Sequence, residues 1–408
     1  MRFVIKLILT ITLLFTSKFT YSDNIPAPSE NAEIELLQVI DYMRNGQNEK
    51  ALIVAAELSK NYPNEKALIV AAELSKNYPN FKLGKIIYAD LLSSYLQKKP
   101  MFSSNSQDKE LIDLKNEAKA RINFNSIYKK KDLLPRSIIQ LSKDTPYAFL
   151  IELSKSRLYL VKNKNGIPEV ISDFYVSIGK EGFNKKTSGD NKTPVGVYNI
   201  TSYLIDEDLP ELYGEGAYPI NYPNTWDKKN KNTGYGIWIH GVPRDVYSRP
   251  PLSSEGCVVT SNHTLRKLEK YIAIGKTPVI LVEKVNWIKR NVWHQNKNIA
   301  NEIIFEWKDT WESLDPHEFI SQHSIDFSSD KHNFEERVAH ILRIIKNKTY
   351  IKVKIENLNL FYYPQNQDLI LSDFRQHYES NNFKTSLNKK LFWKKEKDGI
   401  WRILHEDT

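Results

Sequence analysis

The sequence predicts a multidomain α+β protein with a helical N-terminal region, a mostly-β middle domain and a C-terminal α+β cone. A length of 408 residues exceeds what one ordinary hydrophobic core accommodates. Hydrophobic residues make up 41% of the chain and charged residues 26%, which is typical of globular proteins. The spacing of apolar residues changes from helical to strand-like near residue 146, and from residue 296 helices precede strands.

The first 22 residues differ from the rest of the chain. Arg2 and Lys6 precede an apolar run over residues 7–15, and Thr20-Tyr21-Ser22 offers a small-x-small cleavage site. This pattern predicts a secretory signal peptide cleaved near Ser22, and hence a periplasmic protein; an uncleaved N-terminal anchor is the alternative. No other stretch approaches the ~20 apolar residues of a membrane helix, so we expect no stable membrane span after cleavage.

The charge of the chain is mildly basic. The formal net charge is +9, of which Arg2, Lys6 and Lys18 supply three. A basic chain is suited to an anionic cell envelope. The sequence contains no dense Lys/Arg stripe interleaved with aromatic residues, so we expect no nucleic-acid partner.

Residues 31–128 are predicted to be helical and similar to tetratricopeptide-like repeats. The segment EKALIVAAELSKNYPN at 49–64 recurs unchanged at 65–80, each copy giving one helix and one turn. Because natural repeats diverge, this identity indicates a recent tandem duplication or a sequence-assembly error. We interpret it as a structural insertion. Lys129–Lys131 and Pro135 predict a linker to the next domain.

The middle domain is predicted over residues 146–285 and the last domain over 296–408. The middle domain has one helix, near residues 261–271, and several strand candidates: 148–163, 169–179, 196–205, 235–241 and 277–285. The last domain has two helices, at 299–314 and near 334–346, and then four strands within 351–364, 368–381, 386–398 and 399–407.

Aromatic residues of the last domain suggest its core and its fold. Trp293, Trp307 and Trp311 have helical spacing and are expected to pack in a core. The ending, with Trp393 and Trp401 around a tight turn, resembles the final hairpin of nuclear-transport-factor-2-like (NTF2-like) domains. By analogy with such cones, this domain is expected to form a ligand pocket or a homodimer contact.

Cys257 is the only cysteine. An exported protein usually pairs or avoids its thiols, so a single one suggests a chemical role; a buried structural cysteine is the alternative. A thiol nucleophile needs a base and oxyanion donors. His240, at the end of a strand candidate, is the predicted base, and the N–H groups of Gly256 and Cys257 are the predicted oxyanion hole.

Two motifs around these residues carry a family resemblance. His240-Gly241, followed downstream by Ser254-Glu255-Gly256-Cys257, resembles the signature of the L,D-transpeptidase catalytic domain, and the segment TPVG at 193–196 resembles its strand-entry motif. The resemblance implies that Cys257 attacks the meso-diaminopimelate carbonyl of a peptidoglycan tetrapeptide stem. It also implies that His240 moves the proton and that the Gly241 carbonyl orients the imidazole.

The residues expected to bind substrate surround this pair: Ser254, Glu255, Trp238, Tyr235 and Arg249. The loop before Cys257 contains Arg244, Asp245 and Arg249. Contact with the carboxylates of the stem peptide is one expectation for these residues, and a solvated loop is the alternative. Asp190 and Lys192 are interpreted as turn residues. No cofactor is expected, and no metal, because the histidines lack metal-ligand spacing with a carboxylate.

Two departures from the family pattern leave the reaction open. Glu255 stands where many members have a second histidine, and Val259 stands where many have arginine. The domain layout is similar to that of exported L,D-carboxypeptidases. Cross-linking transpeptidation is the expected reaction from the family resemblance, and these departures make hydrolysis by a carboxypeptidase or amidase the alternative. A non-catalytic peptidoglycan-binding scaffold is a third possibility, disfavoured by the retention of Cys257 and His240.

Overall fold

The structure is a computed structural model that describes Lys50, Val54 and residues 109–122, 132–244, 246, 249–364 and 368–408. The predicted signal peptide lies outside the described residues. So does the tetratricopeptide-like duplication, apart from Lys50 and Val54. Of the predicted helical region, helix α6 (Lys109–Ile122) is described. No helix in the described part of the chain is both long and apolar enough to cross a membrane.

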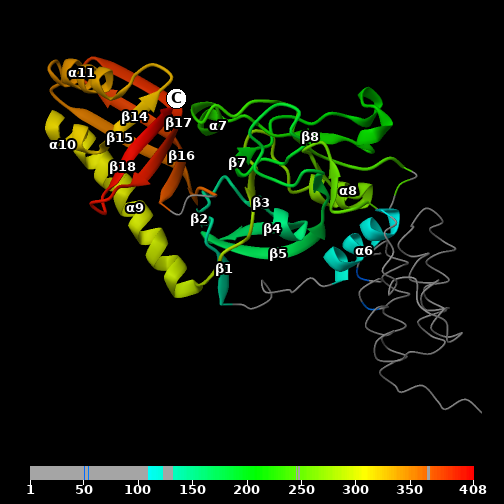
Figure 1. The fold of residues 1–408 in the computed structure, drawn as a ribbon. Coiled ribbons are helices and arrows are strands. Elements are labelled where there is room, and N and C mark those ends of the chain that lie inside the picture. Colours follow the sequence, from blue (N-terminus) through cyan, green and yellow to red (C-terminus); the bar gives the residue numbers. More distant parts are fainter. Residues whose placement is uncertain are drawn as a thin grey trace, which may run out of the picture. The chain divides into compact units, whose positions relative to one another are not determined.

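A mixed five-stranded sheet forms the base of the middle domain (Figure 1). Its strand order is β5-β4-β3-β12-β7, and the central pair β3·β12 is parallel. The strands are β3 (Tyr147–Glu152), β4 (Arg157–Lys164), β5 (Ile167–Tyr175), β7 (Gly196–Asn199) and β12 (Pro278–Val282). All five β12 residues are buried, as expected for a strand covered on both faces.

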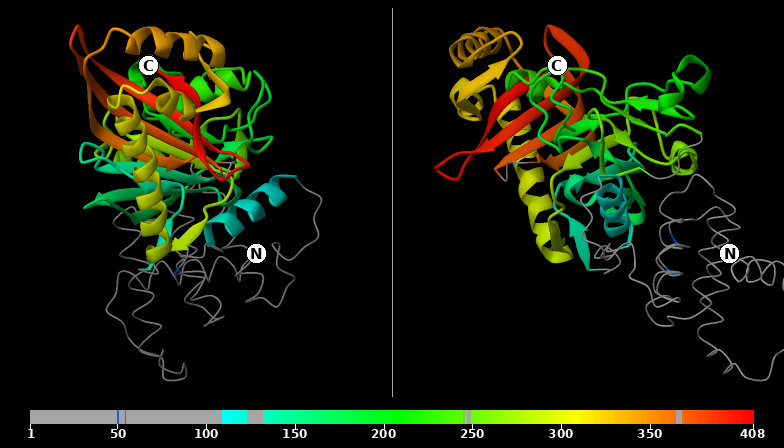
Figure 2. Two further views of the ribbon diagram at one scale, coloured as in Figure 1. Left: turned by 90° about the vertical axis from the view of Figure 1, so that its left-hand side faces the viewer. Right: turned by 45° about the vertical axis from the view of Figure 1, so that its right-hand side comes forward.

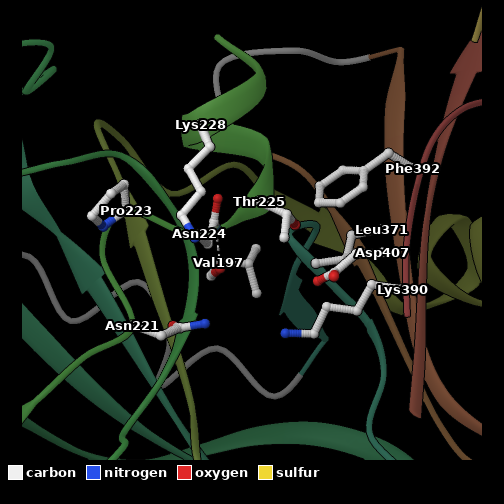
Figure 3. Close-up of a pocket in the computed structure, with 10 residues that line it drawn as sticks. All are labelled: Val197, Asn221, Pro223, Asn224, Thr225, Lys228, Leu371, Lys390, Phe392 and Asp407. Carbon is white, nitrogen blue, oxygen red and sulfur yellow. Dashed lines mark hydrogen bonds between the residues drawn. The ribbon is translucent and has the colours of Figure 1, made fainter. Parts of the chain in front are cut away.

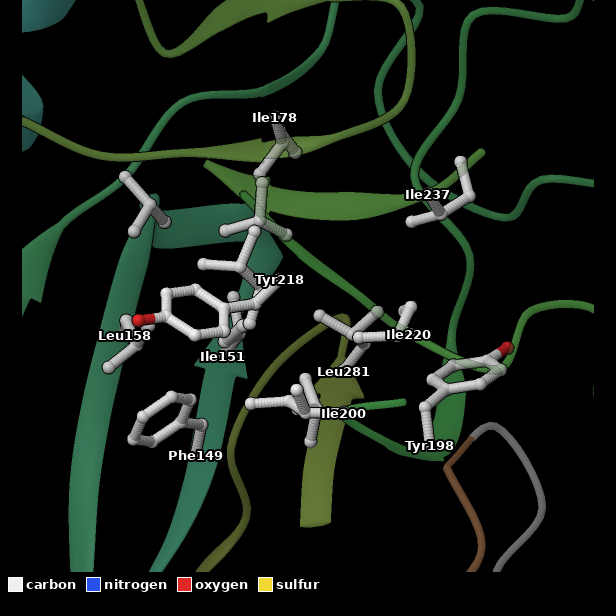
Figure 4. Close-up of a cluster of buried hydrophobic side chains, with 14 of the residues drawn as sticks. Phe149, Ile151, Leu158, Ile178, Tyr198, Ile200, Tyr218, Ile220, Ile237 and Leu281 are labelled. Atoms are coloured by element: carbon white, nitrogen blue, oxygen red, sulfur yellow. The ribbon is translucent and has the colours of Figure 1, made fainter. Parts of the chain in front are cut away.

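Two smaller sheets lie against one face of this base. They consist of β8 (Ala217–Pro219), β9 (Trp238–His240) and β11 (Val258–Val259), and of β6 (Ile178–Gly179) with β10 (Leu252–Ser254). Two helices accompany them, α7 (Thr225–Lys229) and α8 (Asn262–Glu269). Side chains alternate along β3, so Phe149 and Ile151 enter the core shared with the small sheets (Figure 4).

The C-terminal domain packs helices on one face of a six-stranded sheet (Figure 2). Its elements are α9 (Arg290–Glu312), α10 (Pro316–Ser321), β14 (His323–Ser329), α11 (Phe334–Ile345), β15 (Ile351–Tyr362), β16 (Leu369–Ser380), β17 (Phe383–Lys395) and β18 (Trp401–Asp407). The antiparallel run β15-β16-β17-β18 confirms the predicted meander. Trp293, Trp307 and Trp311 are buried, as predicted.

The predicted linker at Pro135 is wrong. Residues Leu133–Pro135 form β1, which pairs with β13 (Trp287–Lys289), and Ile138–Gln140 form β2, which pairs with β15. Ile138 and Ile139 are fully buried. Apolar side chains on both sides of the proline add this segment to a sheet, and a proline is tolerated in a short edge strand.

The second face of the base sheet packs against the C-terminal domain. Ala148 and Leu150 of β3 lie in one cluster with Phe361 and Phe392 of the C-terminal sheet. Trp226 of α7 stacks on Phe392 with ring centroids 4.9 Å apart. The C-terminal sheet therefore uses part of its outer face within this chain, and the predicted homodimer stays a prediction.

A cavity of about 190 Å³ lies at this contact (Figure 3). Asn221 and Lys228 line it from the middle domain, and Lys390, Phe392 and Asp407 line it from the C-terminal domain. None of the predicted site residues is in its wall. The chemistry predicted from the sequence therefore lies elsewhere.

Replacing Trp393 with alanine should lower the free energy of unfolding by about 3–5 kcal/mol, because its ring is fully buried in the C-terminal core. Trp393→Phe should cost less, since it keeps most of the ring and loses the 3.0 Å bond from Nε1 to Ser372 Oγ. Urea unfolding measures both. A urea midpoint of Trp393→Ala equal to that of wild type would contradict the burial of this ring in the C-terminal core.

Candidate functional site

The strand pair β9·β11 brings Cys257 and His240 to one place in the fold. The strands are parallel, with Val258 beside Ile239 and Val259 beside His240. Cys257 immediately precedes β11, and extending this register by one residue places it beside Trp238. Because alternate residues share a face, the side chains of Cys257, Trp238 and His240 are on the same face. The half-buried thiol lies 3.4 Å from the Gly236 carbonyl oxygen.

Hydrogen bonds fix the turn that presents the thiol. The Ser254 hydroxyl donates to the Cys257 carbonyl at 2.6 Å and accepts from the Gly256 amide at 3.2 Å. Thr193 Oγ1 donates to the Gly256 carbonyl at 2.9 Å and accepts from the Gly179 amide at the same distance. Thr193, the first residue of the TPVG motif, thus ties β6 to the cysteine turn.

This geometry bears on two predicted roles, which stay predictions. Ser254, predicted to bind substrate, is buried and its hydroxyl holds the turn. Gly256, predicted to supply an oxyanion donor, already donates its amide to Ser254. The Cys257 amide is then the remaining candidate donor of the pair.

Gly256 has no room for a side chain. Its φ is +122°, and a Cβ there would lie 2.8 Å from the Lys192 carbonyl oxygen. We expect Gly256→Ala to displace the thiol and lower kcat/KM by about 100-fold. Gly182→Ala is the matched control, because Gly182 also has a positive φ, +82°, but open space around its Cβ position. Comparable losses in both variants would contradict the steric argument.

His240 is held in one orientation and one tautomer. It is buried, and its Nδ1 lies 2.7 Å from the Gly241 carbonyl oxygen. Because a carbonyl oxygen can only accept, Nδ1 carries the proton and Nε2 of the neutral ring is left as the base. The ring also meets the Tyr213 ring edge-on, with centroids 5.0 Å apart.

Asn262 holds the backbone that follows His240. Its side chain accepts from the Val242 amide at 3.0 Å and donates to the Val242 carbonyl at 2.8 Å. A Cβ on Gly241 would lie 2.1 Å from Asn262 Oδ1. The glycine of the His-Gly motif is therefore required by close packing against Asn262.

Burial favours the neutral form of both reacting groups. Burial lowers the pKa of His240 to about 4; the Gly241 hydrogen bond opposes this shift and the Arg249 charge adds to it. Burial raises the pKa of the Cys257 thiol, while a backbone hydrogen bond at Trp238 and the Arg249 charge lower it. The resting pair is a neutral thiol and a neutral imidazole that can accept its proton.

The other predicted substrate contacts differ in their exposure to solvent. Tyr235 is 86% exposed and Glu255 is exposed, with Lys180 3.7 Å from its carboxylate. Trp238 is half-buried against Tyr213. Arg249 donates from Nε to Ser253 Oγ at 2.9 Å and is close enough to shift the pKa of both Cys257 and His240.

Two loop features have a structural explanation. Asp190 accepts from the amides of Lys186, Thr187 and Lys192 and pairs with Lys185 at 2.7 Å. These bonds confirm the predicted turn, and they hold the Asp190 pKa at about 2 although burial acts in the opposite direction. Arg244 pairs with Asp206, and Asp245 lies outside the described residues.

Sequence reasoning missed Tyr213, Thr193 and Asn262 as supports of the site. Thr193 is the first residue of the TPVG motif, so the sequence contains a signal for its role. Tyr213 lies far from both motifs, and Asn262 follows the cysteine motif but begins helix α8; the fold brings both to His240 and Gly241. Among the described residues, no group of three or more His, Cys, Asp or Glu side chains could hold a metal ion.

Comparison with known proteins agrees with the resemblance read from the motifs. Residues 146–281 match the family of L,D-transpeptidase catalytic domains, and residues 299–407 match the Cds6 C-terminal NTF2-like domain. Both resemblances predicted from the sequence are thereby confirmed. No curated protein sequence matches the chain.

Two solved structures are similar over most of their length. Bd1075 from Bdellovibrio bacteriovorus shares 28% identity at a TM-score of 0.60, covering 68% of this chain and 98% of that one. The helical cell shape determining protein Pgp2 from Campylobacter jejuni shares 26% identity at a TM-score of 0.57. The match covers 67% of this chain and 95% of that one.

Proposed function

We propose that this protein is a cysteine acyltransferase acting on peptidoglycan tetrapeptide stems, because residues 146–281 match L,D-transpeptidase catalytic domains and residues 299–407 match an NTF2-like domain. The observation that carries the proposal is the adjacency of Cys257, immediately before β11, and an oriented, neutral His240 on β9. A buried thiol remote from the imidazole would have favoured the scaffold alternative.

In the proposed mechanism, His240 Nε2 takes the proton of the Cys257 thiol as sulfur attacks the meso-diaminopimelate carbonyl. The Cys257 amide stabilises the tetrahedral oxyanion. His240 then gives the proton to the departing D-alanine amine, which leaves a thioester on Cys257. The acyl group passes to an acceptor amine, which forms a cross-link or attaches a protein.

Water is the second candidate acceptor, which would make the enzyme a carboxypeptidase or an amidase. Val259 supports this candidate, because it stands where many family members have arginine and it is fully buried. A cationic group that could hold the carboxylate of an acceptor stem is therefore missing from this position. Likeness to a helical cell shape determining protein also fits a role in shaping the wall.

Incubation of the full chain with disaccharide tetrapeptide, followed by mass spectrometry, separates these reactions. Transpeptidation gives cross-linked dimers, hydrolysis gives disaccharide tripeptide and free D-alanine, and a scaffold gives neither. A stem with an attached protein tests the amidase reaction. Unchanged substrates in every mixture would contradict the proposed enzymatic activity.

The proposed substrate also suggests where the protein acts. We place it in the periplasm after removal of the leader ending near Ser22, since peptidoglycan lies there. Detection of the mature form only in the cytoplasmic fraction would contradict this location.

A further inference from the structure

Helix α6 precedes both domains matched by known families and borders the loop that leads to the cysteine. Its residues Lys109–Ile122 lie outside the matched ranges 146–281 and 299–407. It lines, together with Pro250, Pro251 and Leu252, a cavity of about 670 Å³. The helix therefore lies close to the segment that runs into β10 and Cys257.

The last turn of α6 is fixed to the middle domain by buried arginines. Arg157 of β4 donates to the carbonyl oxygens of Ala120 and Arg121 at 3.3 and 3.0 Å. Carbonyl groups in the last turn of a helix lack intrahelical partners, so a buried guanidinium is a favourable cap. Arg121 is itself buried and pairs with Glu117 at 2.9 Å.

Arg121 reaches toward the catalytic loop through Tyr175. Its guanidinium lies over the Tyr175 ring, 4.1 Å from the ring centroid. The Tyr175 hydroxyl then donates to the Arg249 carbonyl at 2.7 Å. One helix side chain and one tyrosine thus separate α6 from the backbone of Arg249.

Arg249 is a charged residue in the described part of this loop, and it lies next to the segment Ser253–Cys257 that presents the thiol. Its guanidinium is fixed by bonds to Ser253, 2.9 Å to Oγ and 3.1 Å to the carbonyl oxygen. Among the described charged groups, Arg249 and Lys185 lower the pKa of the Cys257 thiol and Glu255 raises it. The Arg249 charge also lowers the pKa of His240, so a displacement of its loop would change the pKa of both Cys257 and His240.

We propose that α6 is a positioning element of the active site, in which Arg121 and Tyr175 hold Arg249 beside Cys257 and His240. The inference rests on the proposed function for its meaning in catalysis. In physical terms, helix α6 sets the reactivity of the Cys257 thiol through the position of Arg249. Arg121 and Tyr175 are positioning residues, because neither touches the reacting atoms.

The test measures alkylation of Cys257 by iodoacetamide against pH in the full chain, with intact mass as the readout. Because Cys257 is the only cysteine, the reaction reports on this site alone. Tyr175→Phe removes only the hydroxyl that holds the Arg249 carbonyl, and Arg121→Ala removes the group over the ring. Arg249→Gln serves as the reference for complete loss of the charge.

We expect Tyr175→Phe and Arg121→Ala to slow alkylation about three- to tenfold at a fixed pH below the thiol pKa. Loss of the Arg249 charge beside the thiol raises the pKa of Cys257, so less thiolate is present at that pH. The double variant should be no slower than the slower single variant, because both act through one path. The acidic limb of kcat/KM should move to higher pH as the Arg249 charge leaves His240.

Tyr159→Phe is the matched control, since it removes another buried hydroxyl, bonded to Glu152 at 2.8 Å, and should leave the alkylation profile unchanged. Wild-type alkylation in both Tyr175→Phe and Arg121→Ala would overturn the proposal, whether or not Arg249→Gln shifts. If the alkylation shifts occur but wild type turns over no tetrapeptide, the positioning role stands and the proposed substrate is wrong.

Discussion

Replacing Cys257 with alanine should abolish turnover of disaccharide tetrapeptide, with a fall in kcat on the order of 10⁴-fold or more. The thiol is the only one in the chain, and the turn built by Ser254, Gly256 and Thr193 presents it beside β9. Cys257→Ser should be similarly inactive, because a serine hydroxyl is far less acidic than a thiol. Product formation is measured by mass spectrometry.

The same experiment can detect the covalent intermediate. Intact mass of wild type mixed with substrate should show the protein plus a disaccharide tripeptidyl group, and Cys257→Ala should not show it. Cys257→Ala and Cys257→Ser should keep the wild-type free energy of unfolding to within ~1 kcal/mol, since the side chain is small and half-buried. A folded Cys257→Ala protein that retains a tenth of wild-type turnover would show that another group is the nucleophile.

Sequence patterns were sufficient for the elements whose side chains repeat with a clear period. The meander of the C-terminal domain and the buried tryptophans of α9 follow from alternation and helical spacing. The pairing of β2 with β15 could not be predicted, because it joins residues more than 200 positions apart. Long-range pairing depends on which faces remain uncovered after each domain folds, and local spacing does not contain that information.

The candidate site was predictable to the extent that its chemistry lies in short motifs. His240, Gly241 and Cys257 come from such motifs, and the backbone around them explains why glycine is required at 241 and 256. The bonds of Ser254 within the turn could not be predicted, because the sequence does not show which way a hydroxyl points. Tyr213, Tyr175 and Asn262 act through packing across the fold, so neither motif includes them.

Replacing His240 with glutamine should lower kcat by about 10³-fold, within the range expected for loss of a general acid–base group. Nδ1 donates to Gly241, so Nε2 is the atom that moves the proton, and a glutamine amide is not basic enough to replace it. His294→Gln is a suitable control, because His294 is exposed on α9 in the C-terminal domain. It should keep wild-type kcat.

The pH dependence tests the same imidazole without a substitution. Burial lowers the pKa of His240 to about 4, and protonation of Nε2 removes the base. Activity should therefore persist as the pH falls through 6.5, the ordinary range of a histidine, and be lost only near pH 4. In kcat/KM measured from pH 3 to 8, an acidic limb with its midpoint near 6.5 would mean that the working imidazole is exposed to solvent, contrary to the buried position of His240. A midpoint near 4 that disappears in His240→Gln would identify this ring as the base, because the remaining activity would no longer depend on its protonation.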